Sequence, residues 1–387
     1  MSEAIEGSPS HQPGDSAGRR TIVHFSTAYT WRGGEQQALW LADGLRTRGY
    51  PTVIIAPPVS PLAERGRAAG LEVKEIDCRG EYDLSAVWRV ARLLRHRRAA
   101  AVHAHDGHAV TIAALAGRLA GAKRVCTRRV DFPLRGLWKY RWGMERVICI
   151  SEAVKRVCTT CGLEEEKMRV VRSGIDFTRL AEPPAATIEN LRAEIAAHKA
   201  KGKARPLIVL NLASLVDHKG QRWLLEAMST VLAHLPQTVL AIAGEGELAD
   251  DLAHRCKVLG IENDVRFLGF REDAPALIHA CDLFVMSSHL EGLCTSAMDA
   301  MAAGKAVVVT SAGGLPELVE NEKTGIVVPP RDAEALAAGM LRVLEDRKLR
   351  NHLGRQAQLH AHKHFGREKM VEGTLRVYEE LGIAAFP

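Results

Sequence analysis

The sequence has few aromatic residues and no long apolar segment. Phe, Trp and Tyr make up 5% of 387 residues, so the interior must be built mainly from Leu, Val, Ile and Ala. No run of about 18 or more apolar residues occurs, which excludes a helix that spans a bilayer. With 47% hydrophobic and 25% charged residues, the composition is globular and lies outside the disordered and collagen-like classes.

Signals of secretion are also missing. The first twenty residues are polar and contain no apolar h-region, so we expect no secretory signal and predict a disordered arm over 1–19. The eight cysteines are scattered, which favours reduced, mostly buried thiols over a disulfide framework. Cys158 and Cys161 form a single C-x-x-C with no second pair, so we expect neither a zinc nor a redox site there. These absences predict a cytoplasmic protein.

Positive charge is concentrated in the N-terminal part of the chain. The net charge is +6, but residues 1–180 carry 29 Lys and Arg against 19 Asp and Glu. Residues 181–387 carry 23 against 27. Such asymmetry indicates an anionic partner for the N-terminal part, although a solvated basic face is the simpler alternative.

Two basic stretches also contain aromatic or apolar residues. Residues 88–98 predict an amphipathic helix with a basic rim. The stretch 128–142 mixes cations with aromatic rings, and its candidate acceptor- or membrane-binding residues are Arg128, Arg129, Arg135 and Trp138. This mixture suits an anionic glycolipid or the inner membrane surface. We rank nucleic acid lower as a partner, because no nucleic-acid-binding motif accompanies the stretch.

Short apolar strands alternate with helical segments, which predicts βαβ units and parallel sheets. The predicted strands cover residues 20–27, 51–58, 71–77, 99–105, 122–127, 146–151, 206–214, 238–244, 265–269, 282–288, 305–310 and 325–330. We therefore predict an α/β fold with two Rossmann-like domains facing across a cleft. The domains would cover 20–180 and 206–365, joined by a linker at 181–205. A terminal helix within 366–387 would cross back to the N-terminal domain.

Candidate binding residues lie where predicted strands end. Gly33 and Gly34 precede a helix N-terminus that can bind a phosphate, although a plain tight turn explains them equally well. His105 could bond a sugar hydroxyl or ease a proton transfer, whereas His103 is expected to be structural. Lys219 suits a phosphate as a compact cation, or is a solvated surface lysine. The histidine spacing predicts no metal site, and no G-x-G-x-x-G is present.

Residues 287–319 are the most informative segment. Glu291 lies in a strand-to-helix loop, and the backbone of Cys294 and Thr295 opens the next helix, where N–H groups can bind an anion. Asp299 follows Glu291 by eight residues, or about 12 Å along a helix. That separation exceeds the roughly 5 to 9.5 Å of paired glycosidase carboxylates. We therefore expect the two acids to bind different parts of one long ligand.

These motifs, taken in order, resemble the retaining glycosyltransferases of family 4, which have the GT-B fold. The matching segments are 33–34, 103–105, 173–176, 215–220, 243–248, 265–275, 287–308 and 311–319. The resemblance implies that the C-terminal half binds a UDP-, GDP- or ADP-sugar and that the N-terminal half receives the acceptor. It also implies that the enzyme needs no cofactor and no metal.

The resemblance also implies roles for single residues. Glu291 would contact the transferred sugar, with His105 nearby. The residues at the donor diphosphate would be Gly33, Gly34, Lys219, Leu293, Cys294 and Thr295. Those at the ribose and base would be Asp299, Phe270, Arg271 and Gly244. This chain departs from the family pattern where Asp299 replaces Glu, Ser214 replaces Arg and Arg172 replaces Asn.

We therefore expect a hexosyltransferase that moves a sugar to an anionic, membrane-associated glycan or glycolipid. A lipopolysaccharide core intermediate at the inner face of the cytoplasmic membrane is the natural example. The alternatives are a nucleotide-sugar epimerase and a non-catalytic nucleotide-sugar-binding subunit. An NAD-dependent oxidoreductase fits the α/β pattern but lacks the glycine fingerprint.

Overall fold

The computed structural model describes residues 20–199 and 205–383, which form two compact units. The first unit contains the chain up to Thr127, Trp138–Arg146 and the chain from Leu375. The second contains Arg128–Leu137 and Val147–Thr374. The arm predicted over 1–19 lies outside the described residues. The predicted α/β fold of two parallel sheets is confirmed.

The first sheet is parallel, with the strand order β3-β2-β1-β4-β5-β6-β7. Its strands are β1 (Ile22–Phe25), β2 (Thr52–Ala56), β3 (Glu72–Glu75), β4 (Ala101–Ala104), β5 (Lys123–Arg128), β6 (Arg146–Cys149) and β7 (Met168–Val170). The sequence predicted the first six of these strands. β7 was not predicted, because a segment of three residues, one of them an arginine, is too short to show the alternation typical of a strand.

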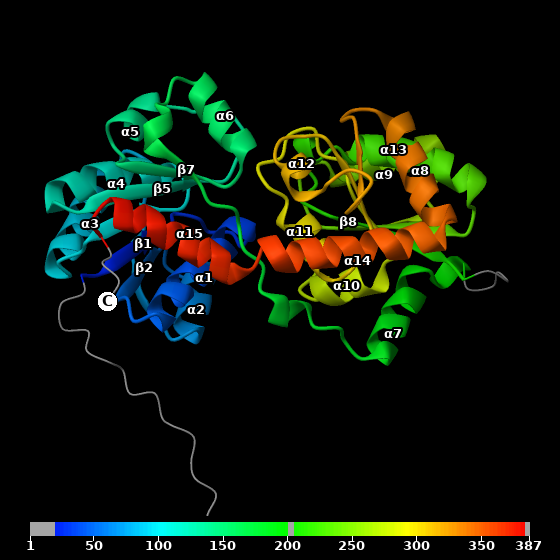
Figure 1. Ribbon diagram of the computed structural model, residues 1–387, viewed down its shortest axis with the longest axis horizontal. Coiled ribbons are helices and arrows are strands. Elements are labelled where there is room, and N and C mark those ends of the chain that lie inside the picture. Colours follow the sequence, from blue (N-terminus) through cyan, green and yellow to red (C-terminus); the bar gives the residue numbers. More distant parts are fainter. Residues whose placement is uncertain (1–19, 200–204, 384–387) are drawn as a thin grey trace, which may run out of the picture. The chain divides into compact units, whose positions relative to one another are not determined.

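Helices connect these strands, as the alternating sequence pattern predicted. They are α1 (Gly33–Thr47), α2 (Pro61–Ala68), α3 (Leu84–His96), α4 (Gly107–Ala120), α5 (Leu137–Arg141) and α6 (Glu152–Thr160). Helices α1 and α2 pack on β2 through a small core of Ala, Leu and Ile side chains. Figure 1 shows this part in blue to green.

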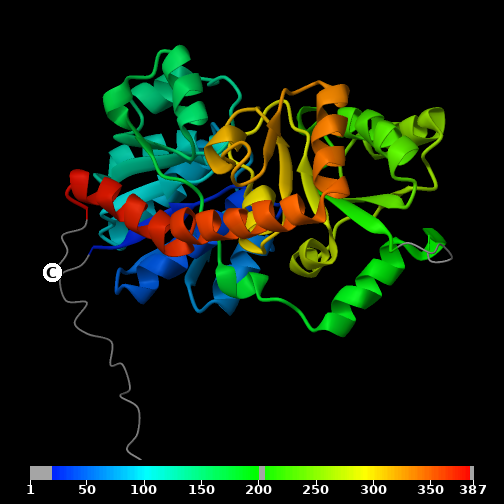
Figure 2. The same cartoon turned by 45° about the vertical axis from the view of Figure 1, so that its right-hand side comes forward.

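The second sheet is also parallel, with the order β10-β9-β8-β11-β12-β13. Its strands are β8 (Leu207–Leu212), β9 (Thr238–Ala243), β10 (Val265–Phe267), β11 (Leu283–Met286), β12 (Val307–Thr310) and β13 (Ile326–Val328). The helices around it are α8 (Gln221–His234), α9 (Ala249–Leu259), α10 (Ala274–Ala280), α11 (Thr295–Ala302), α12 (Leu315–Leu318), α13 (Ala333–Glu345) and α14 (Arg347–His364). A large aliphatic core joins the sheet to α8, α9 and α13, while α10 and α11 cover its other face (Figures 1 and 2).

The last helix, α15 (Arg367–Glu380), begins in the second unit and ends in the first. Within the first unit, Tyr378 is fully buried and its hydroxyl lies 2.6 Å from Nδ1 of His103. Glu380 forms an ion pair with Arg146 at 3.1 Å. The terminal helix is therefore an integral part of the first unit's packing.

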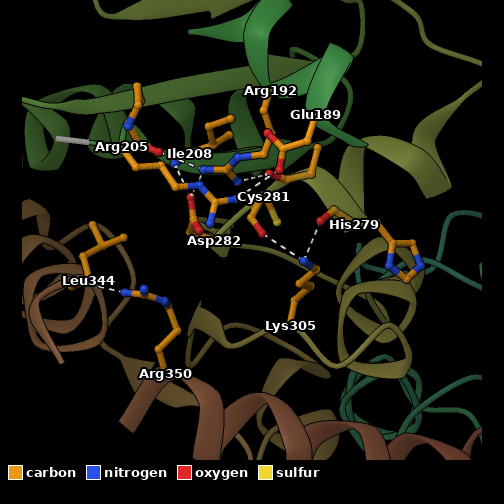
Figure 3. A network of polar contacts seen from close by, with 12 residues as sticks. Glu189, Arg192, Arg205, Ile208, His279, Cys281, Asp282, Lys305, Leu344 and Arg350 are labelled. Atoms are coloured by element: carbon orange, nitrogen blue, oxygen red, sulfur yellow. Dashed lines mark hydrogen bonds and ion pairs between the residues drawn. The ribbon is translucent and has the colours of Figure 1, made fainter. Parts of the chain in front are cut away.

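The interval predicted as a linker contains helix α7 (Ala185–Ile195), which is part of the second unit and packs against α10. Figure 3 shows the anchor: Arg192 donates to the backbone oxygens of Ala280 and Pro206 and to the carboxylate of Asp282. Asp282 also accepts a hydrogen bond from the N–H of Ile208 at 2.8 Å. This buried arginine fixes α7 against the start of β8.

The basic helix predicted over 88–98 is α3. It buries Val87, Val90, Ala91 and Leu94, and it packs against α4. Leu84 and Trp88, by contrast, are 74% and 56% exposed. Across residues 20–199 and 205–383, none of the helices has the length and apolar character needed to cross a bilayer.

Candidate functional site

The centre of the candidate site is an ion pair between Lys219 and Glu291. Lys219 ends a short 3-10 turn (Asp217–Lys219) after β8, and Glu291 lies in the loop after β11. Nζ of Lys219 lies 2.6 Å from Oε2 of Glu291, and Oγ of Ser288 donates to the same oxygen at 3.2 Å. Because β8 and β11 are neighbours in the sheet, both loops emerge at its carboxyl edge, where ligands bind in such folds.

Burial and charge act in opposite directions on these groups. Burial lowers the pKa of Lys219, but the neighbouring carboxylates, that of Glu291 more than that of Asp131, raise it by more, so the ammonium form is stabilised. Burial raises the pKa of the Cys294 thiol to about 11. Cys294 is therefore protonated near neutral pH and unsuited to act as a thiolate nucleophile.

Three glycines make the close packing around Glu291 possible. A Cβ on Gly313, whose φ is +51°, would lie 1.8 Å from the backbone oxygen of Glu291. A Cβ on Gly314 would lie 2.3 Å from the oxygen of Gly292, and one on Gly292 would lie 2.3 Å from the oxygen of Arg129. The N–H of Gly314 donates to the oxygen of Glu291 at 2.9 Å. Side chains at these positions would push the Glu291 loop out of place.

Leu293, Cys294 and Thr295 lead into α11, as the sequence predicted. Leu293 and Cys294 are buried, and Cys294 occupies the N-cap position without a capping hydrogen bond from its side chain. The first N–H groups of a helix have no partner within the helix, and the helix dipole is positive there. The segment therefore offers an anion-binding backbone next to the Lys219 ammonium.

Asp299 lies one turn further along α11 and is already paired. Its Oδ2 is 2.5 Å from Nη2 of Arg179, a residue that sequence reasoning did not select. Burial raises the pKa of Asp299 to about 6, and the Arg179 guanidinium acts against that rise. The predicted ribose-binding acid is therefore one half of an arginine–carboxylate pair.

Gly244, Phe270 and Arg271 follow β9 and β10. Gly244 has φ +141°, and a Cβ there would lie 2.0 Å from the oxygen of Ala213. The Phe270 ring is 57% exposed. The Arg271 guanidinium is paired with Asp273 and Glu194, and these hydrogen-bonded acids raise its pKa. An exposed ring beside a fixed guanidinium can stack on a planar base.

The basic and aromatic stretch predicted over 128–142 contains an acid that the sequence analysis passed over. Asp131 is 9% exposed and lies beside the Glu291 loop, while the neighbouring ring of Phe132 meets the His218 ring edge to face at 5.4 Å. Arg128 donates to the oxygen of Phe132, and Arg135 is exposed. Arg128–Leu137 belongs to the second unit, whereas Trp138 belongs to the first and is 36% exposed.

In the first unit, Gly33 and Gly34 open α1. The carboxylate of Glu35 accepts a hydrogen bond from the N–H of Arg32 at 2.9 Å, so this helix start is partly capped by its own side chain. The predicted His105 follows β4 and is buried. Its Nε2 lies 3.0 Å from Nδ1 of His24, on β1.

His24, His103 and His105 form a buried stack of imidazoles. Ring centroids lie 4.4 Å apart for His103 and His105 and 5.2 Å apart for His24 and His105. Their nitrogens are close enough for a metal ion, yet both nitrogens of His103 already contact hydroxyls, those of Tyr378 and Thr127. Nδ1 of His24 and Nε2 of His105 contact each other, whereas Nε2 of His24 is buried with no hydrogen-bond partner in the part of the chain that the structure describes. The predicted absence of a metal stays a prediction.

Comparisons with known proteins relate the whole chain to glycosyltransferases. A family model described as "Glycosyl transferases group 1" matches residues 194–360, and one described as "Glycosyltransferase Family 4" matches residues 31–179. The lipopolysaccharide core biosynthesis glycosyltransferase LpsE of Rhizobium meliloti is 31% identical over 65% of this chain and 68% of LpsE. An Escherichia coli α-1,3-galactosyltransferase, named for UDP-Gal and GlcNAc-diphosphoundecaprenol, is 25% identical over 69% of this chain and 72% of its own length.

Solved structures extend the likeness to the fold of the full chain. Anabaena HepE, solved with UDP and glucose, has a TM-score of 0.82 and 22% identity, covering 94% of this chain and 100% of HepE. The chain spans between 44% and 72% of the length of the curated relatives it matches.

Proposed function

Because this chain belongs to the family 4 glycosyltransferases of GT-B fold, we propose that it transfers a hexose from a nucleotide-diphosphate sugar to an anionic, membrane-associated glycan or glycolipid. The observation that carries the proposal is the Lys219–Glu291 pair beside the uncapped start of α11. It combines a fixed cation, an anion-binding backbone and a buried carboxylate. The cation and the backbone N–H groups can bind a diphosphate, and the carboxylate can stabilise positive charge on a sugar.

In the proposed reaction, the bond between the anomeric carbon and the diphosphate oxygen breaks. An acceptor hydroxyl oxygen forms the new bond to that carbon, and its proton passes to the released diphosphate. Lys219 and the N–H groups at Leu293, Cys294 and Thr295 stabilise the negative charge that grows on the leaving group. Glu291 stabilises the positive charge at the anomeric carbon, and retention of configuration is proposed by family membership.

The donor is proposed to be a UDP-hexose. HepE was solved with UDP and glucose, and the E. coli relative is named for UDP-Gal. The Arg179–Asp299 pair would bind the ribose hydroxyls, while Phe270, Arg271 and Gly244 would border the base. We also propose Gly33, Gly34 and His105 as donor-binding residues. Since Lys219 and the backbone supply the positive charge, we propose that transfer needs no divalent metal.

The acceptor is proposed to be a glycolipid at the inner membrane surface. LpsE is named for lipopolysaccharide core biosynthesis, and the E. coli relative for a diphosphoundecaprenol-linked sugar. In the first unit, α3 exposes Leu84 and Trp88 on a helix rich in arginine. Exposed rings together with cations favour anionic lipid headgroups.

The test of the proposed chemistry is sugar transfer from UDP-, GDP- and ADP-hexoses in the presence of EDTA, with undecaprenyl-linked and lipopolysaccharide core acceptors. We expect one donor class to support transfer. Glu291→Ala should abolish transfer while donor binding, measured by calorimetry, persists. The exposed Glu322→Gln serves as the matched control. Full activity of Glu291→Ala would refute the site, and consumption of donor without acceptor would indicate the epimerase instead.

The acceptor surface needs a separate test. Replacing Arg128, Arg129 and Arg135 together by Ala should raise the acceptor KM and weaken binding to vesicles that contain phosphatidylglycerol. A control with the same change of charge replaces Arg347, Lys348 and Arg355, which are exposed on α14. If the two triple variants behave alike, the basic stretch has no specific role.

A further inference from the structure

The loop after β5 brings a second carboxylate to the Glu291 loop. Asp131 is 9% exposed, and its Oδ2 lies 3.1 Å from the position that a Cβ on Gly313 would occupy. That same position is 1.8 Å from the backbone oxygen of Glu291. Asp131 is therefore at the candidate site and not on the outer surface of the basic stretch.

Asp131 has no cation to pair with among the described residues, whereas Glu291 has Lys219 and Asp299 has Arg179. Burial raises the pKa of Asp131 and the nearby Glu291 carboxylate adds to the rise, while backbone N–H groups of Asp131 and Glu291 and the His218 imidazole act against it. Asp131 thus has backbone N–H groups near it but no ion pair with a described residue, and a buried carboxylate in that state is costly to the fold. A hydroxyl group of a bound ligand would add a hydrogen bond that offsets part of this cost.

The charges around Asp131 indicate which chemical group of a ligand can bind there. A second carboxylate next to Glu291 repels a phosphate, so Asp131 does not suit the diphosphate end of the donor. Carboxylate oxygens accept short, charge-assisted hydrogen bonds from hydroxyl groups. The neutral hydroxyls of a hexose seated between Glu291 and the Asp131 loop match these requirements.

We propose that Asp131 accepts a hydrogen bond from a hydroxyl group of the hexose held at Glu291, and so determines which sugar the donor carries. This inference rests on the proposed function. A site that pairs a buried polar group with a substrate hydroxyl rejects the analogue that lacks the hydroxyl by as much as about 10⁴-fold, because the buried group is then left unpaired. Asp131 would thus act on the sugar and leave the nucleotide unaffected.

The experiment compares the UDP-hexose that supports transfer with its 2-, 3-, 4- and 6-deoxy analogues, in the wild type and in Asp131→Ala. In the wild type, one analogue should lose at least about 100-fold in kcat/KM. In Asp131→Ala, kcat/KM for the parent sugar should fall by a similar factor, whereas kcat/KM for that one analogue should be the same as in the wild type. UDP alone, measured by calorimetry, should bind both proteins equally.

Variants and outcomes keep the test decisive. Asp131→Asn preserves the shape of the side chain if Asp131→Ala fails to fold, and it should show an intermediate effect because its amide oxygen still accepts. Asp250→Asn is the control, since that side chain is exposed on α9. Equal losses for UDP and for every sugar would show that Asp131 only supports the Glu291 loop and would overturn the inference. If the wild type uses no nucleotide sugar, the proposed function fails together with the inference. If the relative kcat/KM values of the deoxy analogues are the same in Asp131→Ala as in the wild type, only the inference is refuted.

Discussion

Replacing Asp299 by Asn should change how the stability of the protein depends on pH. Burial raises the pKa of Asp299 from 3.8 to about 6. Between these values the native state binds more protons than the unfolded state, so the free energy of unfolding falls as pH rises through this window. This direction is opposite to that of an ordinary salt-bridged aspartate, whose pKa is lowered on folding.

The magnitude follows from the size of the shift. Each pKa unit corresponds to about 1.4 kcal/mol, so a shift of about 2 units makes charged Asp299 cost about 3 kcal/mol above pH 6. The asparagine side chain of the variant is neutral at every pH and avoids this cost. Only the charged carboxylate interacts with Arg179 as an ion pair, so that interaction is already part of the pKa of about 6 and adds no separate dependence on pH. The stability of Asp299→Asn relative to the wild type should therefore rise by about 2.5 kcal/mol from pH 4 to pH 7.

Urea unfolding followed by circular dichroism, at half-unit steps from pH 4 to 7.5, measures this difference. Asp250→Asn, at an exposed position on α9, is the control and should track the wild type. Arg179→Ala should shift the window to higher pH, since Arg179 is the group that acts against the rise. Parallel curves for Asp299→Asn and the wild type would refute the assignment of a buried, titrating carboxylate.

Three further substitutions test other parts of the structure. Arg192→Ala should lower the free energy of unfolding by about 3 kcal/mol, because Asp282 would keep a buried charge without its partner. Arg205→Ala removes an exposed ion pair and should cost less than about 1 kcal/mol. Similar costs for the two variants in urea unfolding would contradict the role of Arg192 in holding α7. Burial lowers the pKa of His24 to about 3, so the wild type should lose stability as pH falls below 6.5, and His24→Phe should lose less stability over the same range. The variant should also transfer sugar more slowly, because His105 would lose its contact with His24. Identical acid unfolding of the two proteins would count against this. Gly313→Ala should reduce transfer far more than Gly260→Ala, since both have positive φ but only the Gly313 Cβ meets Glu291; equal activities would exclude a role for that contact.

The fold could be predicted from the sequence because its signal is local. Most of the buried parallel strands are short apolar runs, and twelve strands were found from the alternation of such short segments with helical ones. β7 was not found, since three residues carry no period. Helix α7 lay in an interval that prolines and charges marked as a linker, and its anchor through Arg192 depends on Asp282, which is distant in sequence. Ion pairs of this kind leave no trace in a single sequence.

The candidate site was predicted in its residue types but not in its pairings. Lys219 and Glu291 were selected from separate motifs, and nothing in their spacing indicated that they touch. Arg179 was passed over because β7 was not predicted, so the connection between β7 and α7 that contains Arg179 was not recognised as a strand-to-helix segment. Asp131 lies among arginines in a basic stretch of the sequence and was not selected. A lone acid within such a stretch was the signal available, and only the packing at Gly313 gives it meaning.

The pairings also change how donor binding should be understood. Lys219 is paired with Glu291 in the absence of a ligand, so a donor diphosphate that binds as proposed must compete with that carboxylate for the ammonium. In the proposed complex Glu291 would lose its countercharge inside a buried loop, and a carboxylate in that state favours a neighbouring positive charge. The anomeric carbon acquires such a charge only as the bond to the diphosphate breaks. Binding of the diphosphate would thereby prepare Glu291 to stabilise the transition state more than the bound substrate, which is the condition for catalysis.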